Sequence, residues 1–251
     1  MGNPVGTLKV LGYTSACVLA GIPTTFPLHL SLAVTRRFGR EDRLKRLHRM
    51  VEWAGFCRQQ ILQVDLDRVG AEHLPLNSRG HMFVSNHQSW IDILVLMESL
   101  NTVAFLSKQM VRYIPVLGSC AYAGGTIFIN RRLRNSRQQA LEETLRMCKE
   151  STAVVVFPEG TRSFDGELRQ EIHPRAIEAA YEHGLKVIPV AVDGTSKVLP
   201  KSMDRLNLGQ RVAVTIGEPL KPREFGDSQS WVEAVWGRVT SQFQQSRGRL
   251  R

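Results

Sequence analysis

Several features of common protein classes are missing from this sequence. Its four cysteines stand far apart, without a Cys-x-x-Cys pair or a histidine at zinc-finger spacing, so we expect reduced, inert thiols of the kind that suits the cytosol. Ser89 does not lie in a Gly-x-Ser-x-Gly elbow, which gives no support for a serine nucleophile. Internal repeats and long linkers are also absent, so one main domain is expected for the 251 residues.

Acidic residues are in the minority. The chain has 23 Asp and Glu against 33 Lys and Arg, and the resulting charge of +10 is large for this length. The natural partners are therefore anionic: nucleic acid, an acidic membrane surface or a phosphorylated substrate. Composition does not choose among these three, although a hydrophobic content of 43% indicates a globular body.

Formal charges are absent from residues 10–35. This stretch is long enough to cross a bilayer, but Pro23 and Pro27 lie inside it, which disfavours a single straight spanning helix. The next block, residues 36–49, has seven Lys or Arg against two acids and is typical of the cytoplasmic, anionic-lipid-facing flank of a membrane anchor. Residues 1–50 are therefore predicted to form a membrane-associating helical segment. A signal peptide and a buried pair of core helices are the competing interpretations.

The remaining chain, residues 51–251, alternates short β-rich runs with longer helical ones. Nearly continuous apolar runs are typical of strands covered on both faces, so we predict an α/β domain with a mixed, largely parallel sheet flanked by helices. Helices are predicted over residues 50–66, from a capping box at Ser136, after Pro174, and at the C-terminus, where the last one should fray into a basic tail. The expected strands are residues 81–85, 102–107, 126–130, 153–157, 186–192 and 211–217.

His87 and Asp92 follow the first of these strands. Because they are five residues apart, they cannot share one face of a helix. If the strand ends near Ser85 and a helix starts near Ser89, His87 lies in the turn and Asp92 can fold back toward it from the first helical turn. An acid bonded to one ring nitrogen fixes the tautomer and leaves the other nitrogen as a general base. A capping box formed by Ser89 and Asp92 is the purely structural interpretation.

Polar residues also follow two further strands. In the loop 157–163, with the sequence FPEGTRS, Arg162 can bind a phosphate through two hydrogen bonds, and Glu159 can orient a cation or a hydroxyl. Arg131 ends the strand before it, although a solvated charge is the ordinary fate of such a residue. Since loops at the strand ends of such a sheet meet, we expect one shared anion site. The side chains that could contribute to it are Arg131, Glu159, Thr161 and Arg162, the last three in a turn that Gly160 makes permissive.

The order of these motifs, Asn-His-x-x-x-x-Asp, Gly-x-x-Phe-x-x-Arg, FPEGTRS and then VIPVAV, resembles the 1-acyl-sn-glycerol-3-phosphate acyltransferase family over roughly residues 80–220. The resemblance implies that His87 is the general base for the sn-2 hydroxyl and that Asp92 orients it. It also implies an acceptor site, with the arginines on the glycerol phosphate, made up of Arg131, Glu159, Gly160, Thr161 and Arg162. It implies direct transfer from acyl-CoA or acyl-acyl carrier protein (acyl-ACP), giving phosphatidic acid in phospholipid biosynthesis without an acyl-enzyme, metal or cofactor.

The implied partners are lysophosphatidic acid, the acyl donor, membrane lipids and acyl carrier protein, with no nucleic acid. The implied location is the cytoplasmic face of a membrane, such as the bacterial inner membrane. One departure concerns the acceptor, because residues 172–175 read Ile-His-Pro-Arg where the family usually has Phe-Lys-x-Gly. A lyso-ornithine lipid or another lysophospholipid is therefore a second candidate acceptor.

Two different functions compete with acyl transfer to a lysolipid. A hydrolase would use the same histidine and acid to activate water, and it would release free fatty acid. A basic nucleic-acid-binding protein would account for the charge of +10, but it leaves the motifs unexplained.

Overall fold

The structure, a computed structural model, describes residues 8–13, 15–17, 19, 40–101, 103–113, 118, 121–122, 125–130 and 133–251. In these residues the strands are β1 (Asp65–Val69), β2 (His81–Ser85), β3 (Ala104–Lys108), β4 (Ile127–Ile129), β5 (Val154–Val156), β6 (Lys186–Asp193) and β7 (Arg211–Ile216). They form one sheet in the order β1-β7-β6-β2-β5-β3-β4. Neighbours are parallel except β6 and β7, so the predicted mixed, largely parallel sheet is confirmed.

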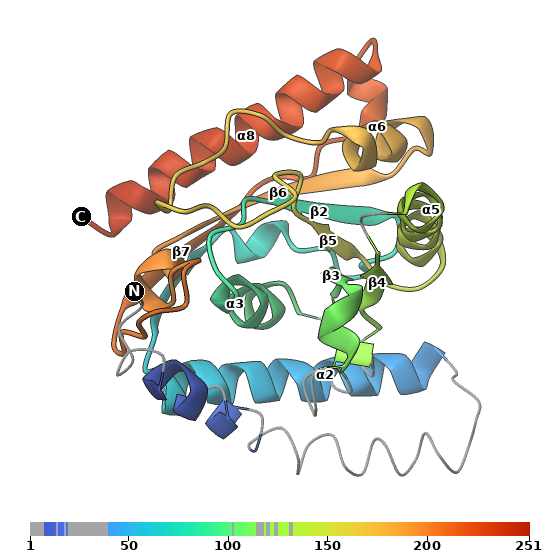
Figure 1. Ribbon diagram of the computed structural model, residues 1–251. Coiled ribbons are helices and arrows are strands. Elements are labelled where there is room, and N and C mark those ends of the chain that lie inside the picture. Colours follow the sequence, from blue (N-terminus) through green and yellow to red (C-terminus); the bar gives the residue numbers. More distant parts are fainter. Residues whose placement is uncertain are drawn as a thin grey trace.

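Helices cover both faces of this sheet (Figure 1). On one face lie α2 (Arg40–Phe56) and α3 (Ile91–Leu100), and on the other lie α6 (Arg175–Glu182) and α8 (Ser228–Arg249). The long helix α5 (Arg134–Glu150) contributes to the same buried cluster as α6 and α8. Shorter helical pieces are η1 (Cys57–Ile61), η2 (Ala71–His73), η3 (Gln109–Tyr113), α7 (Thr195–Val198) and η4 (Pro222–Glu224).

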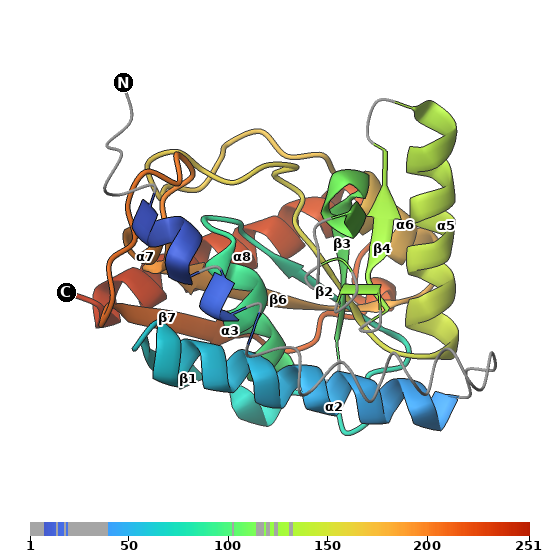
Figure 2. The ribbon, with the colours of Figure 1, turned by 60° about the horizontal axis from the view of Figure 1, so that its bottom comes forward.

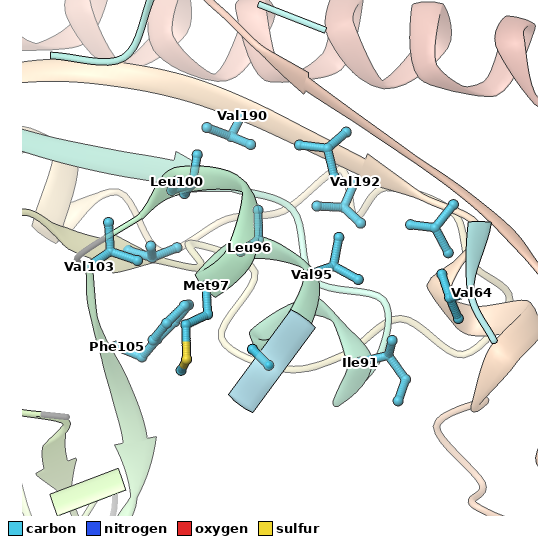
Figure 3. Packing of buried hydrophobic residues seen from close by; sticks show 14 of the residues in the cluster. Val64, Ile91, Val95, Leu96, Met97, Leu100, Val103, Phe105, Val190 and Val192 are labelled. Carbon is cyan, nitrogen blue, oxygen red and sulfur yellow. The ribbon is translucent and has the colours of Figure 1, made fainter. Parts of the chain in front are cut away.

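Apolar side chains of α3 fill the space between this helix and the sheet. Val95 and Leu96 are fully buried and belong to one cluster with Val190 and Val192 of β6 (Figure 3). Seven of the eight residues of β6 are buried, which explains its continuous apolar run. Close packing on a central strand fixes the start of α3 relative to the strand ends where polar residues gather.

Some local predictions are wrong. The helix predicted over residues 50–66 begins earlier, at Arg40, and is followed by η1 and then by strand β1, an edge strand that carries Asp65, Asp67 and Arg68. The capping box at Ser136 is not formed, because α5 begins two residues earlier and the Ser136 hydroxyl accepts the backbone N–H of Asn130 at 2.9 Å. The C-terminal residues do not fray, since α8 continues to Arg249.

Most of the predicted membrane-associating segment lies outside the described residues. In its described part, Leu8, Leu11 and Leu19 are exposed, whereas Val10 is buried in the core. In Figure 2 this N-terminal helical piece, in dark blue, lies beside α3 and the orange loop that leads to β7. Among the helices of the described residues, none has the combination of length and apolarity needed to cross a membrane. Helix α2 runs through residue 50, where the membrane-associating segment is predicted to end. The division of the chain at this residue stays a prediction.

Candidate active site

The turn after β2 is tied to β6 by the side chain of Asn86. Its amide oxygen accepts the backbone N–H of Val192, and its amide nitrogen donates to the carbonyl of Val192, both at 2.8 Å. Asn86 thus continues the strand pairing one residue beyond Ser85, and His87 follows immediately. The predicted placement is confirmed: His87 lies in the turn and Asp92 in the first turn of α3.

Asp92 is fully buried and surrounded by hydrogen-bond donors. Its Oδ2 accepts from His87 Nδ1 at 2.7 Å and from the backbone N–H groups of Gln88 at 2.7 Å and Ser89 at 2.9 Å. Its Oδ1 accepts from the Thr195 hydroxyl. Four donors suit an ionised carboxylate, which accepts hydrogen bonds only. With the acid on Nδ1, the ring proton is assigned to Nδ1, and Nε2 is left as the basic nitrogen.

The structure supports part of both interpretations of Asp92, the helix cap and the partner of His87. Acceptance of the Ser89 N–H is one half of a capping box. The other half is missing, because the Ser89 hydroxyl donates to the Leu199 carbonyl at 2.6 Å and accepts from the Ile91 N–H at 3.2 Å. The same carboxylate oxygen therefore stabilises the start of α3 and bonds to the imidazole of His87.

The loop 157–163 contacts His87 at its ring, its backbone N–H and its carbonyl. The Phe157 ring stacks on the imidazole, with centroids 4.2 Å apart and planes 17° apart. The backbone N–H of His87 donates to Glu159 Oε1 at 2.7 Å, and its carbonyl accepts from the Ser163 N–H at 2.9 Å. Ring, amide and carbonyl are all fixed, so the orientation of His87 depends on this loop as well as on Asp92.

Glu159 is 2% exposed and faces the protein. Its second oxygen accepts the backbone N–H of Arg169 at 3.3 Å. Burial raises the pKa of Glu159 to about 7, although the N–H groups of His87 and Arg169 lower it. The sequence suggests that Glu159 orients a cation or a hydroxyl of the substrate. Both oxygens accept from backbone N–H groups, one of them that of His87, and the suggested part of Glu159 in orienting a cation or a hydroxyl stays a prediction.

Gly160 has a φ of +66°, a backbone conformation that favours glycine. A Cβ atom at this position would lie 2.7 Å from Cδ2 of His173. The backbone N–H of His173 donates to the Pro158 carbonyl at 2.8 Å. His173, one of the residues that depart from the Phe-Lys-x-Gly pattern, therefore lies directly against the loop 157–163.

Arg162 is partly buried, with its Cζ 5.7 Å from the ring centroid of Trp90. Its Nη1 is buried and has no hydrogen-bond partner among the described residues. Burial lowers the pKa of Arg162, and the charge of Asp92 raises it. A buried guanidinium N–H without a partner is costly, and an anion bound there would remove that cost.

Further positive charges lie near Arg162. Burial, followed by the charges of Arg162, Arg169 and Lys108, lowers the pKa of Lys201. Sequence reasoning missed both lysines as candidates. Lys108 ends β3, and a charge at the end of an apolar strand was an available signal. Lys201 follows α7 in a stretch without any motif, so no signal in the sequence points to it.

Two candidates from the sequence remain, Thr161 and Arg131. Thr161 is partly buried between Gly160 and Arg162 in the same loop. Arg131 lies outside the described residues, so its part in an anion site stays a prediction. The thiol of Cys148 is fully buried, and burial raises its pKa to about 12, which agrees with the expected inert thiol at this position. A hydrogen bond with Cys57 lowers the pKa of Cys17, so the expectation does not extend to that thiol.

An apolar cavity of about 350 Å³ adjoins this site. Trp90, the residue beneath Arg162, is part of its wall, and so are Leu199 and Ile91. The cavity lies on the α3 face of the sheet and reaches the N-terminal helical piece. Its wall also includes Ile93, Leu94 and Met97 of α3, Met50 and Trp53 of α2, Phe105 and Leu106 of β3, and Val10, Tyr13 and Cys17.

Comparison with known proteins gives similarity to acyltransferases. The acyltransferase family model matches residues 66–193. A chloroplastic 1-acyl-sn-glycerol-3-phosphate acyltransferase from Arabidopsis thaliana is 30% identical over 207 residues, which cover 81% of this chain and 57% of that protein. The lyso-ornithine lipid O-acyltransferase from Pseudomonas aeruginosa is 40% identical over 113 residues, which cover 44% of this chain and 42% of that protein. The chain thus spans about half of the length of these relatives.

A solved structure is similar over nearly the whole chain. It is the crystal structure of the 1-acyl-sn-glycerophosphate (LPA) acyltransferase from Thermotoga maritima. The TM-score is 0.76 at 27% sequence identity, and the match covers 92% of this chain and 94% of that one. A match over 92% of this chain includes the sheet and helices on both of its faces.

Proposed function

Because the chain belongs to the acyltransferase family, we propose that it transfers an acyl chain from acyl-CoA or acyl-ACP to the sn-2 hydroxyl of 1-acyl-sn-glycerol-3-phosphate, giving phosphatidic acid. The observation that carries this proposal is the bond of 2.7 Å between His87 Nδ1 and a buried Asp92 carboxylate, beside Arg162, whose buried Nη1 has no partner among the described residues. A base, an acid that orients it and an anion site thus occur together.

In the proposed reaction, His87 Nε2 takes the proton from the sn-2 hydroxyl as the oxygen attacks the thioester carbonyl. Asp92 stabilises the imidazolium that forms. When the tetrahedral intermediate collapses, the carbon–sulfur bond breaks and the imidazolium returns its proton to the leaving thiolate. His87 Nε2 has no hydrogen-bond partner among the described residues and is thus available for this proton. A thioester is already activated, so the proposed transfer requires no cofactor.

The charges near Arg162 support a phosphorylated acceptor. Arg162 presents a guanidinium that can bind a phosphate with two hydrogen bonds. Arg162, Arg169 and Lys108 lie close enough to Lys201 for their charges to lower its pKa. Bringing positive groups together is unfavourable, so an anionic ligand among them gains affinity from all of them. We assign the glycerol phosphate to this cluster, with Arg131 as a further proposed member.

The cavity on the α3 face supports a long acyl chain as the transferred or retained group. Its wall is apolar, and burial of a hydrocarbon chain there is favourable by about 0.8 kcal/mol per CH₂ group. Exposed apolar side chains near its wall, including Leu8, Leu11 and Met110, support association with a membrane surface, from which such lipids would be taken. The basic charge of the chain favours the cytoplasmic, anionic face of that membrane.

A second acceptor deserves a test alongside lysophosphatidate. The lyso-ornithine lipid O-acyltransferase is 40% identical over its matched part, against 30% for the plant enzyme. His173 also replaces the family pattern directly beneath Gly160. A lyso-ornithine lipid presents a different head group to the positive cluster, and its reaction would use the same His87–Asp92 pair.

The test is an acyl-transfer assay with acyl-CoA and a panel of lysolipids, followed by thiol release and lipid mass spectrometry. We expect phosphatidate from lysophosphatidate, loss of this product in His87→Ala, and its retention in His81→Ala. His81 is a matched control at the opposite end of β2, where its ring contacts the Arg79 carbonyl at 2.8 Å. Retained turnover in folded His87→Ala overturns the proposed base, and free fatty acid without acylated lipid indicates a hydrolase instead.

A further inference from the structure

Gln88 connects the turn that holds His87, here called the catalytic turn, to a polar cluster formed by Gly166, Asp193 and Arg247. Its side chain is 1% exposed, and its amide nitrogen donates to the Gly166 carbonyl at 2.5 Å and to Asp193 Oδ1 at 2.8 Å. Two acceptors around one nitrogen fix the orientation of the amide. Because the backbone N–H of Gln88 donates to Asp92 at 2.7 Å, the position of Gln88 also affects the carboxylate that orients His87.

Thr195 lies between this amide and Asp92. Its hydroxyl is fully buried, donates to Asp92 Oδ1, and lies 3.2 Å from Gln88 Oε1. A hydroxyl has one proton, and the shorter contact gives it to Asp92. The side chain of Gln88 thus borders the group that holds the second oxygen of Asp92.

Arg247, near the end of α8, closes the outer side of the same cluster. Its Nη2 donates to the Gly166 carbonyl at 3.1 Å, and its Nε lies 3.4 Å from Asp193 Oδ2. These are the two residues that accept hydrogen bonds from the Gln88 amide. Its Nη1 lies 2.6 Å from both carboxylate oxygens of Glu167, which anchors the guanidinium from the solvent side.

We propose that Arg247 is a positioning residue for the His87–Asp92 pair and acts through Gly166, Asp193 and Gln88. This inference rests on the proposed function, since it assigns Arg247 a part in that reaction. Asp193 is 5% exposed, and a buried carboxylate without its cation is costly. Without Arg247, Asp193 and the Gly166 carbonyl are expected to shift toward other donors, and Gln88 loses the two acceptors that hold it.

The chain offers a matched control two residues further along α8. Arg249 also forms an ion pair, with its Nε 2.7 Å from Asp67 Oδ2, and its Nη2 donates to Thr215 Oγ1 at 3.0 Å. These partners belong to the neighbouring strands β1 and β7 and make no contact with the catalytic turn in the described hydrogen bonds. If the end of α8 served stability alone, both arginines would behave alike.

The experiment compares kcat and KM of full-length Arg247→Met and Arg249→Met with the most active lysolipid of the panel. For Arg247→Met we expect kcat to fall roughly tenfold or more, as on loss of outer partners of catalytic groups, while KM changes less than about twofold. For Arg249→Met we expect kcat within about twofold of the wild-type value. Melting temperatures establish that both variants are folded.

A double-mutant cycle tests the route through Gln88. If Arg247 acts through this amide, Gln88→Leu together with Arg247→Met is about as slow as Gln88→Leu alone, whereas independent effects multiply. Should Arg247→Met fail to fold, Arg247→Lys replaces it. Lysine keeps the charge but cannot reproduce the planar, forked contact with Gly166 and Asp193, so an intermediate kcat is expected.

Any of three results overturns the inference. The first is a wild-type kcat in folded Arg247→Met or Arg247→Lys, the second is an equal loss of kcat in Arg247→Met and Arg249→Met, and the third is multiplicative effects in the double-mutant cycle. A wild-type protein that acylates no lysolipid refutes the proposed function instead. The two failures are therefore distinguishable, because only the first occurs in a protein whose wild-type form is active.

Discussion

The two faces of the sheet are filled in different ways, as two tryptophans illustrate. On the α8 face, Trp231 is fully buried, its Nε1 donates to the Ile177 carbonyl at 3.0 Å, and its ring meets Phe225 edge-on with centroids 5.1 Å apart. On the α3 face, Trp53 is also buried but borders the cavity of about 350 Å³. The side chain of Trp53 thus borders a cavity on the face that carries the candidate site, whereas Trp231 on the opposite face is enclosed by close-packed neighbours.

The largest effect is expected at Asp92, at the start of α3. Asp92→Asn should lower kcat by about 10³- to 10⁴-fold, because an amide cannot accept from all four donors and favours the wrong tautomer of His87. Glu98→Gln on the same helix is the control, since it weakens the ion pair with Arg58 at 2.6 Å and leaves the turn intact. A role of Asp92 limited to capping would cost only about 1 kcal/mol of stability and spare kcat.

The next effect concerns stability on the packed face. Trp231→Ala should lower the free energy of unfolding by about 3–5 kcal/mol, because the void cannot be refilled by its close-packed neighbours. Chemical denaturation measures this loss. At temperatures where the variant is folded, its preference among acyl chains should equal that of the wild type. A changed chain preference would mean that this face also contributes to the ligand site.

Substitutions at the cavity on the α3 face should instead change the preference among acyl chains. Leu94→Trp places bulk in the cavity and should reduce kcat/KM for long acyl chains by roughly tenfold relative to short ones, since each methylene excluded from an apolar site costs about 1 kcal/mol or more. Trp53→Ala enlarges the same space and should shift the preference toward longer chains. A series of acyl-CoA and lysolipid lengths measures both. Unchanged profiles in both variants would remove the cavity from the substrate path.

The smallest effect is a pH dependence of stability at Glu159. Its folded pKa of about 7 lies above the ordinary value of 4.5, so the folded state holds this proton more tightly. The stability contributed by this group is therefore greatest below about pH 4.5 and is lost as the pH rises through 7. Glu159→Gln should flatten this decline between pH 5 and 8, as followed by melting temperature, whereas exposed Glu233→Gln should not. Equal slopes in all three proteins would contradict the burial argument.

The sheet was predictable because its central strands are apolar runs with both faces covered. β1 was missed because it is an edge strand with three charged residues among five, so it lacks the apolar run that identifies the central strands. The His87 turn was predictable since strand end, spacing and chain direction together leave one arrangement. The residue types at Ser136 fit a capping box, but contacts with the rest of the fold set the start of α5 at Arg134.

The contacts that hold the site residues in place could not be predicted from the sequence. The bond from the His87 amide to Glu159 joins residues 72 apart, and the contacts of Arg247 with Asp193 and Gly166 join residues 54 and 81 apart. Such contacts depend on how loops from different strands meet, which no local pattern encodes. Arg247 in particular resembles part of a solvated basic tail until the fold places it against Asp193.

In the proposed reaction the acyl chain passes directly from the thioester to a lysolipid hydroxyl that His87 deprotonates. The most direct test is a single-turnover experiment with radiolabelled acyl-CoA, with and without lysophosphatidate, in the wild type and in His87→Ala. We expect label in phosphatidate only when wild-type protein and acceptor are both present, and no label on the protein at any time. Label attached to the protein, or equal transfer by folded His87→Ala, would contradict direct transfer by this base.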